Sequence, residues 1–261
     1  MDSFLSNKPL IGMLHLQPLA GSVGYARKGT KPIIDAALRD LYALESGGVD
    51  AVFVENLSDA PYAKTAPVET VAMMTTVVHT LIERAHIPLG VNMLRNDGLA
   101  AMAIAAATGA SFVRVNVFCG VAFTDQGMIE GDARGLHWLQ RDLGTETLIL
   151  ADVHVKHAAH PTTLEEAALD ADRNRPDALI VSGIGTGRRT APEDLQIVKQ
   201  VVSVPVLIGS GVRIDNVATY READGFIVGT VLKEGGSVDA PVDVERVKAM
   251  ADAIASLRDS E

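Results

Sequence analysis

The sequence has almost no cysteine and few aromatic residues. Cys119 is the only cysteine among 261 residues, so no internal disulfide can form, which suits a reducing cytoplasm. Aromatic residues make up 4% of the chain and hydrophobic residues 48%, so valine, isoleucine, leucine and alanine must fill most of the core. The sequence also lacks a signal-peptide pattern at its N-terminus and any run of about 18 apolar residues. We therefore expect a cytoplasmic protein without a membrane span.

Positive charge is scarce as well. The chain has 23 lysines and arginines against 33 aspartates and glutamates, which gives a formal net charge of −10. Nucleic acids and anionic membranes both attract basic surfaces, so this balance disfavours both partners. It does not exclude a small phosphorylated metabolite, because backbone N–H groups can hold a phosphate locally.

Strand-like and helix-like segments alternate along the whole chain. Short apolar runs, typical of strands covered on both faces, lie at 9–16, 50–56, 88–93, 111–117, 147–154, 178–182, 204–209 and 224–229. Helical patterns lie at 33–47, 67–85, 98–108, 132–142, 163–174, 192–202, 214–221 and 243–258. Eight such units predict a single α/β domain over residues 1–261, a closed (β/α)8 TIM barrel. An open doubly wound sheet is the alternative; the barrel is favoured because polar residues follow nearly every strand.

Residues with known capping preferences predict where several of the helices begin or end. Gly47-Gly48 is expected to end the first helix, Asp97 to cap the third, and Thr163 with Glu166 to form a capping box. The longest non-helical connections are expected at 17–31 and 118–131, where lids and binding loops are common and mobile loops also occur.

Residues 148–157 carry the strongest chemical signal. Asp152, His154 and Lys156 occupy alternate positions at the end of an apolar strand, which predicts that all three side chains point the same way. Lys156 would form a Schiff base, donate a proton or fix an anion, and His154 would relay protons. A structural salt bridge between Lys156 and Asp152 is the alternative. Glu55 and Asp125 are the carboxylates expected to assist.

Polar residues at the other strand ends predict a single pocket, since the active site of a barrel lies where its strands end. We expect substrate contacts from His15, Asn92, Arg95, Asn96, Asn116, Gly183, Thr186, Gly209, Ser210, Gly211, Gly229 and Thr230. Gly209-Ser210-Gly211 and Gly229-Thr230 follow the last two strands, where barrels often bind phosphate. Ordinary tight turns are the alternative. Lys233 would add positive charge to this phosphate site.

A divalent metal is a further alternative. Glu55, Asp152 and His154 would suit one, completed by Asn92 or His15, but no HExxH or CxxC spacing supports it. We therefore assign no metal ligand and leave the cofactor unknown. Cys119 fits a small buried residue better than a nucleophile.

Seven stretches together resemble the BtpA/SgcQ family of barrel proteins. They are residues 9–21 (PLIGMLHLQPLAG), 50–61 (DAVFVENLSDAP), 88–97 (PLGVNMLRND), 112–117 (FVRVNV), 124–127 (TDQG), 151–157 (ADVHVKH) and 209–212 (GSGV). The resemblance implies a barrel of the ribulose-phosphate-binding type. It also implies an association with photosystem I biogenesis or stability in one branch, and with sugar utilisation and a nucleosidase label in the other.

Two functions from different classes follow. The first is a cytoplasmic enzyme acting on a phosphorylated sugar or nucleoside-like metabolite, as a nucleosidase or as a lyase or isomerase. The second is a non-enzymatic factor for photosystem I biogenesis or another assembly role. A homo-oligomer is expected only because symmetric assemblies are common.

Overall fold

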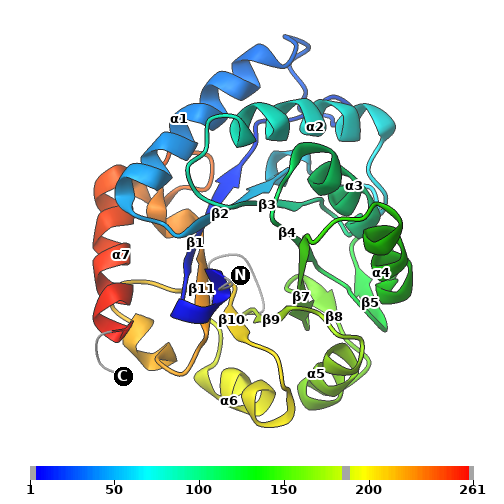
Figure 1. The fold of residues 1–261 in the computed structure, drawn as a ribbon, viewed down its shortest axis with the longest axis vertical. Coiled ribbons are helices and arrows are strands. Elements are labelled where there is room, and N and C mark those ends of the chain that lie inside the picture. The colour runs from blue at the N-terminus through cyan, green and yellow to red at the C-terminus, as the bar shows by residue number, and fades with distance from the viewer. Residues whose placement is uncertain (1–3, 184–188, 259–261) are drawn as a thin grey trace.

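The protein is a closed parallel barrel with helices on its outside (Figure 1). The structure is a computed structural model that describes residues 4–183 and 189–258. Eight strands close in the spatial order β1-β2-β3-β4-β7-β9-β10-β11, which confirms the predicted TIM barrel. They are β1 (Leu10–His15), β2 (Ala51–Glu55), β3 (Leu89–Asn92), β4 (Phe112–Val115), β7 (Leu148–Val153), β9 (Ala178–Val181), β10 (Val206–Ile208) and β11 (Gly225–Val228).

The connecting helices cover the barrel strands from outside. They are α1 (Lys31–Gly47), α2 (Val68–Ile82), α3 (Gly98–Thr108), α4 (Ala133–Asp142), α5 (Leu164–Arg173), α6 (Pro192–Val201) and α7 (Val244–Arg258). Three expected boundaries are confirmed: Gly48 follows α1 with φ 90°, Asp97 accepts from the Ala100 N–H, and Thr163 forms the capping box with Glu166. No helix in the described part of the chain is long and apolar enough to cross a bilayer.

Strand alternation sorts the side chains into two layers. Outward-facing residues pack against the helices in the larger core cluster, whereas a second cluster fills the barrel interior. Phe53 and Phe112 meet edge to face inside the barrel, with ring centroids 4.6 Å apart. Gly90 makes room for this pair, because a Cβ there would lie 2.2 Å from the Phe112 ring. Above this apolar floor, the next inward positions along the strands are polar.

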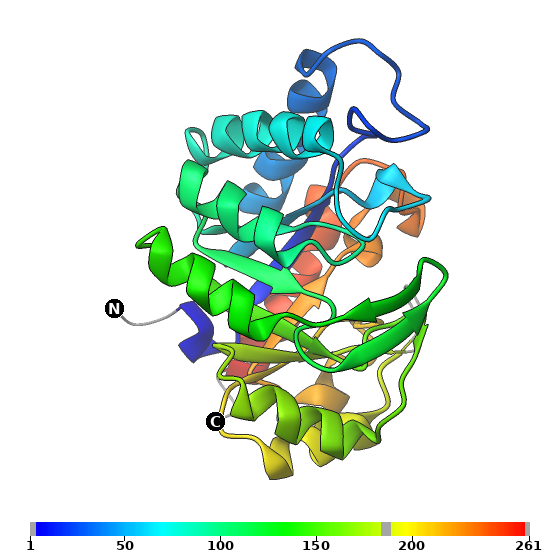
Figure 2. The same cartoon turned by 90° about the vertical axis from the view of Figure 1, so that its right-hand side faces the viewer.

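The two ends of the barrel are built differently. At one end the short 3-10 helix η1 (Phe4–Asn7) brings Leu5 onto the interior cluster. At the other end, the segment after β1 and a green hairpin project beyond the strands (Figure 2). That hairpin is β5 (Val121–Thr124) with β6 (Gly127–Glu130), and β8 (Ala158–Ala159) pairs with β5 to complete a small antiparallel sheet.

One expected connection is confirmed and one expected helix is wrong. The 118–131 connection is non-helical, and its 121–130 part forms the β5–β6 hairpin, closed by the Thr124 hydroxyl on the Gly127 carbonyl. The helix expected at 214–221 is only the 3-10 turn η3 (Val217–Tyr220). Asn216 side-chain bonds to the backbone at 211 and 213 stabilise a turn there in place of an α-helical start.

Candidate functional site

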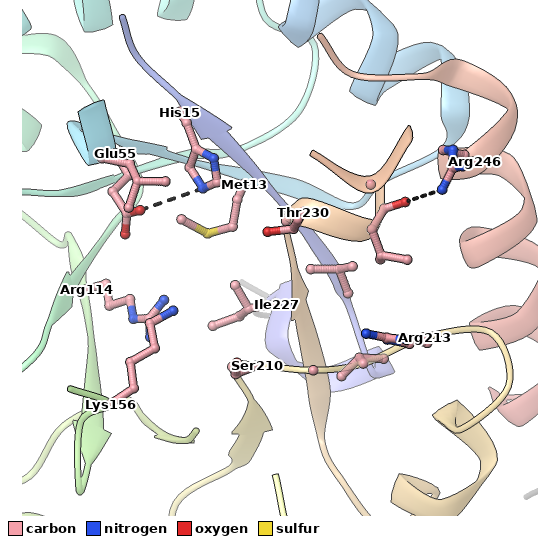
Figure 3. A pocket seen from close by; sticks show the side chains of 18 of the residues that line it. Met13, His15, Glu55, Arg114, Lys156, Ser210, Arg213, Ile227, Thr230 and Arg246 are labelled. Atoms are coloured by element: carbon pink, nitrogen blue, oxygen red, sulfur yellow. Dashed lines mark hydrogen bonds and ion pairs between the residues drawn. The ribbon is translucent and has the colours of Figure 1, made fainter. Parts of the chain in front are cut away.

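A cavity of about 370 Å³ opens at the ends of the barrel strands (Figure 3). We call it the central cavity. Eight of the residues predicted from the sequence line this cavity: His15, Glu55, Lys156, Gly209, Ser210, Gly211, Gly229 and Thr230. It is also lined by Arg114, Arg213 and Arg246, which the sequence reasoning did not select. Figure 3 shows His15, Glu55, Arg114 and Lys156 on one side of the cavity, facing Thr230, Arg213 and Arg246 on the other.

Glu55 and His15 form a buried pair on the first side. Their strands are neighbours in register, so the two inward side chains meet at the same level of the barrel. The Asn92 side chain donates to Glu55 Oε1 at 2.6 Å, and His15 Nε2 lies 3.7 Å from Glu55 Oε2. Both side chains are only 8% exposed. Asn92 thus fixes one carboxylate oxygen of Glu55 and leaves the other toward His15.

Burial, opposed by Glu55 and assisted by the ammonium groups of Lys233 and Lys156, lowers the pKa of His15 to about 4. His15 is therefore a neutral imidazole near neutral pH. A neutral imidazole can accept a proton at one nitrogen and donate at the other, which suits proton transfer inside the cavity.

This shift predicts a pH-dependent stability. Between pH 6.5 and about 4 the unfolded chain protonates His15 while the folded protein does not, so the free energy of unfolding should fall as pH falls through this window. The expected loss of stability is zero above pH 6.5 and reaches about 3 kcal/mol below about pH 4. Denaturant unfolding of the wild type and His15→Gln at several pH values measures it, since the variant should show the shallower dependence. Parallel curves would contradict the depressed pKa.

Lys156 reaches the same side of the cavity from the loop after β7. Its ammonium makes no hydrogen bond or ion pair with any described residue, so the salt bridge to Asp152 that was the alternative to a ligand-facing role does not form. Burial lowers the pKa of Lys156, the Arg114 and Arg95 guanidiniums add to this, and Glu55 and Asp152 oppose it. The Arg95 guanidinium donates to the Lys156 backbone carbonyl at 2.9 Å, which positions the residue.

Asp152 is occupied by a buried network. Arg114 donates to both of its carboxylate oxygens at 2.9 and 2.8 Å, Asn116 donates at 2.7 Å and Ser182 at 3.2 Å. The Arg114 and Asp152 side chains are 2% and 0% exposed. A carboxylate holding four donors has no oxygen left to act as a base. The structure places Asp152 as the anchor of Arg114 below the cavity.

His154 departs from the expected direction. The strand ends at Val153, and His154 takes φ 52°, so the alternation that should have aligned it with Asp152 and Lys156 is broken. Its ring instead stacks on His160, with centroids 4.3 Å apart, in a separate cavity of about 170 Å³. The expectation that the three side chains share one face is therefore wrong.

The opposite side of the cavity is built from the backbone after β10 and β11. A Cβ on Gly209 would lie 2.4 Å from Ile180 and 2.8 Å from the Ser182 hydroxyl, so this turn needs glycine. Gly211 has φ +71°, which glycine adopts without strain. None of the described residues accepts a hydrogen bond from the backbone N–H of Gly211, Thr230 or Val231. These donors, with Arg213 and Arg246, favour an oxyanion here.

The remaining predicted residues lie outside the central cavity lining. Asn96 exchanges hydrogen bonds with the Val117 backbone, and Asn116 belongs to the Asp152 network. Asp125 is exposed at the hairpin tip, where Gln126 donates to it. Gly183 is buried just after β9, and Thr186 lies outside the described residues.

The proposed metal ligands are not brought together. Within residues 4–183 and 189–258, no three histidine, cysteine, aspartate or glutamate side chains gather as a metal site would require. Asp152 is bound to Arg114 and His154 lies in another cavity, so neither joins Glu55. Cys119 lines the His154 cavity, and burial raises the pKa of its thiol, which makes it a poor nucleophile.

The fold is a closed (β/α)8 barrel with a cavity at the ends of its strands. The solved thiamine phosphate pyrophosphorylase from Pyrococcus furiosus superimposes with a TM-score of 0.62 over 98% of this chain and 99% of that chain, at 16% identity. An identity this low carries the fold and not the reaction.

Sequence comparison assigns the family. The model of the BtpA family matches residues 6–256, so the chain belongs to the BtpA family. An uncharacterized Pyrococcus furiosus protein is 48% identical, with 95% of each chain covered. The photosystem I biogenesis protein BtpA of Synechocystis is 40% identical, with 97% of this chain and 90% of that protein covered.

Proposed function

We propose that the protein is an enzyme that binds a phosphorylated sugar in the central cavity and acts on it through Lys156. The observation that supports this most is the charge of the cavity. In a chain of net charge −10, the lining carries Lys156 and Arg213, which pair with no carboxylate among the described residues, against a single lining carboxylate, Glu55. Arg114 and Arg246 also line the cavity, but they pair with Asp152 and Asp243. Such a concentration of cations in an acidic protein favours an anionic ligand.

The phosphate would bind on the Thr230 side. The free backbone N–H groups of Gly211, Thr230 and Val231 offer donors at fixed positions, and the Arg213 side chain at the rim adds a charged donor. Phosphate groups in barrels of this kind commonly bind after the last two strands. The sugar would then extend across the cavity toward His15, Glu55 and Lys156.

Lys156 would supply the covalent chemistry. Its lowered pKa increases the fraction of neutral amine, which adds to the carbonyl carbon of an open-chain sugar phosphate. Loss of water from the adduct gives an iminium, which stabilises negative charge on the neighbouring carbon. His15 and Glu55 would accept and return the proton at that carbon. This sequence fits a lyase or an isomerase.

A nucleosidase is favoured less by this geometry. Glycoside hydrolysis commonly uses two carboxylates that flank the reacting bond. Glu55 is the only carboxylate among the described residues that line the central cavity, and Asp152 is bound to Arg114. The cavity therefore suits lysine chemistry better.

An assembly role is the second candidate, supported by the 40% identity to the Synechocystis photosystem I biogenesis protein. An unpartnered lysine beside a buried histidine and glutamate has no evident use in assembly alone.

Ligand-dependent melting tests the proposal. Inorganic phosphate and pentose and hexose phosphates should raise the melting temperature of the wild type, because they bind the folded state. Arg213→Met should weaken this binding about ten- to hundredfold, the effect of losing one charged hydrogen bond. Arg221→Met, an exposed arginine outside the cavity lining, is the matched control. No shift in folded wild-type protein would instead support the assembly role.

A further inference from the structure

A second cavity adjoins the central cavity through His15. It has a volume of about 550 Å³ and lies between the segments after β1 and β2, α1 and the 233–241 segment. We call it the lateral cavity. His15 and Leu57 line both cavities, so the two spaces adjoin at these side chains. The residues that matter for its chemistry are Lys233, Arg39 and Asp40.

Lys233 is the unusual member of this lining. The residue is 2% exposed, yet its ammonium makes no hydrogen bond or ion pair with any described residue. Its backbone is firmly placed, since its N–H donates to the Thr230 carbonyl and the residue forms a bridge with Val242. The sequence reasoning assigned Lys233 to the phosphate site at Thr230, but the side chain faces the neighbouring cavity instead.

The nearby carboxylates do not neutralise Lys233. Asp40 accepts from the Val242 N–H and lies 3.8 Å from the Arg39 guanidinium, and Asp239 is exposed. Burial lowers the pKa of Lys233 despite the opposing charges of Asp40 and Asp239. A buried ammonium without a partner is costly. Lys233 is such a group, because no side chain among the described residues pairs with its ammonium. A bound anion would supply the missing partner.

His15 stands between two ammonium groups. Lys233 lies in the lateral cavity and Lys156 in the central cavity, and both charges act on the His15 ring. The short segment 229–233 lines both cavities, with Thr230 in the central cavity and Lys233 in the lateral cavity. The His15–Glu55 pair therefore has a candidate anion donor on each side.

We propose that the lateral cavity is a second oxyanion subsite, so that the protein takes a phosphate on Thr230 and a second phosphate or carboxylate on Lys233, with the reacting carbons at His15. This rests on the proposed function and names its substrate class as doubly anionic. The two anions belong either to one molecule that spans both cavities or to two substrates that meet at His15.

Anion occupancy tests the subsite. Crystals soaked in selenate, a phosphate-like anion with an anomalous signal, should show one peak at the Thr230 backbone and a second at Lys233. Lys233→Met should remove the second peak alone, and Lys248→Met, an exposed lysine on α7, should remove neither. A wild-type peak only at Thr230 overturns the second subsite, and no peak in either cavity overturns the proposed function as well. Loss of the Thr230 peak in Lys233→Met would place Lys233 in the first site and also overturn the inference.

Comparing bisphosphates with monophosphates shows whether one molecule spans both cavities or two molecules bind. Sugar bisphosphates of three to six carbons are compared with their monophosphates on the wild type and Lys233→Met. If one molecule spans both cavities, a bisphosphate binds more tightly than its monophosphate, and the variant loses about ten- to hundredfold of that affinity while its monophosphate affinity is unchanged. If two substrates meet at His15, the first site is saturated with a monophosphate and a second anion is then added. Lys233→Met should lose affinity for this second anion only.

Stability shows whether Lys233 has only a structural role. Removing an unpaired buried charge should raise the melting temperature of Lys233→Met above that of the wild type. A melting temperature that falls, with anion binding unchanged in both cavities, would make Lys233 a structural residue and overturn the subsite.

Discussion

Replacement of Lys156 by methionine is expected to lower turnover of a phosphorylated sugar by about a thousandfold or more, with phosphate affinity nearly unchanged. The methionine retains the length and apolar stem of lysine but cannot add to a carbonyl. Phosphate affinity should persist because the proposed phosphate site at Thr230 lies across the cavity from Lys156 (Figure 3). Steady-state kinetics on the sugar phosphate with the largest melting shift measures the loss in kcat and in kcat/KM.

Two further variants identify the role of Lys156. Lys156→Arg retains the positive charge but cannot form an imine, so it should be as inactive as Lys156→Met if the amine is the nucleophile. Lys64→Met removes an exposed lysine near the hairpin turn, outside the cavity lining, and should leave turnover unchanged. Borohydride reduction in the presence of substrate should attach the sugar to Lys156, detected by peptide mass. Full activity in Lys156→Arg would assign the lysine to charge stabilisation instead.

The fold was predictable because it depends on patterns that repeat along the chain. Each barrel strand is a short apolar run, and the period-two alternation that buries Phe53 also turns Glu55 inward one step later. The same rule places His15 above Met13 and Gly209 above Leu207. The cavity residues on β1, β2 and β10 therefore follow from the strand boundaries alone.

The parts that failed depend on tertiary structure. Side chains alternate between the two faces of the strand only up to Val153, where the strand ends, so the predicted alignment of Asp152, His154 and Lys156 fails. No local sequence pattern marks that end. Arg114 was passed over, although an arginine two residues after Phe112 inside an apolar strand signals a buried inward charge. A buried arginine needs a carboxylate partner inside the barrel, and in the structure that partner is Asp152. Which charges neutralise each other depends on neighbouring strands, and a single sequence does not state it.

The hairpin has a local sequence signal. Val121–Thr124 and Gly127–Glu130 are short β-prone runs around a turn that ends in glycine, which is a recognised hairpin signal. The prediction of a non-helical connection at 118–131 does not include this pairing. The consequence is local, because Asp125 lies at an exposed turn, outside the lining of the central cavity.

The Arg114–Asp152 pair should be the most costly polar interaction to break. Asp152→Leu leaves a fully buried guanidinium without its carboxylate, so the free energy of unfolding should fall by about 3–5 kcal/mol. For a chain near this size, that corresponds to a melting temperature lower by roughly 10 °C. Guanidinium chloride unfolding measures the change. Glu245→Gln, which breaks the exposed pair with Lys248, should cost less than about 1 kcal/mol.

The double variant Arg114→Met/Asp152→Leu should recover most of the lost stability, because it removes both buried charges together. Asp152 holds the Arg114 guanidinium in place at the central cavity. Asp152→Leu should therefore displace this guanidinium and weaken anion binding in the cavity. Asp152→Asn should retain part of the network and lie between the wild type and Asp152→Leu in stability. A double variant that costs the sum of both single variants would show that the two side chains act independently, contrary to their shared hydrogen bonds.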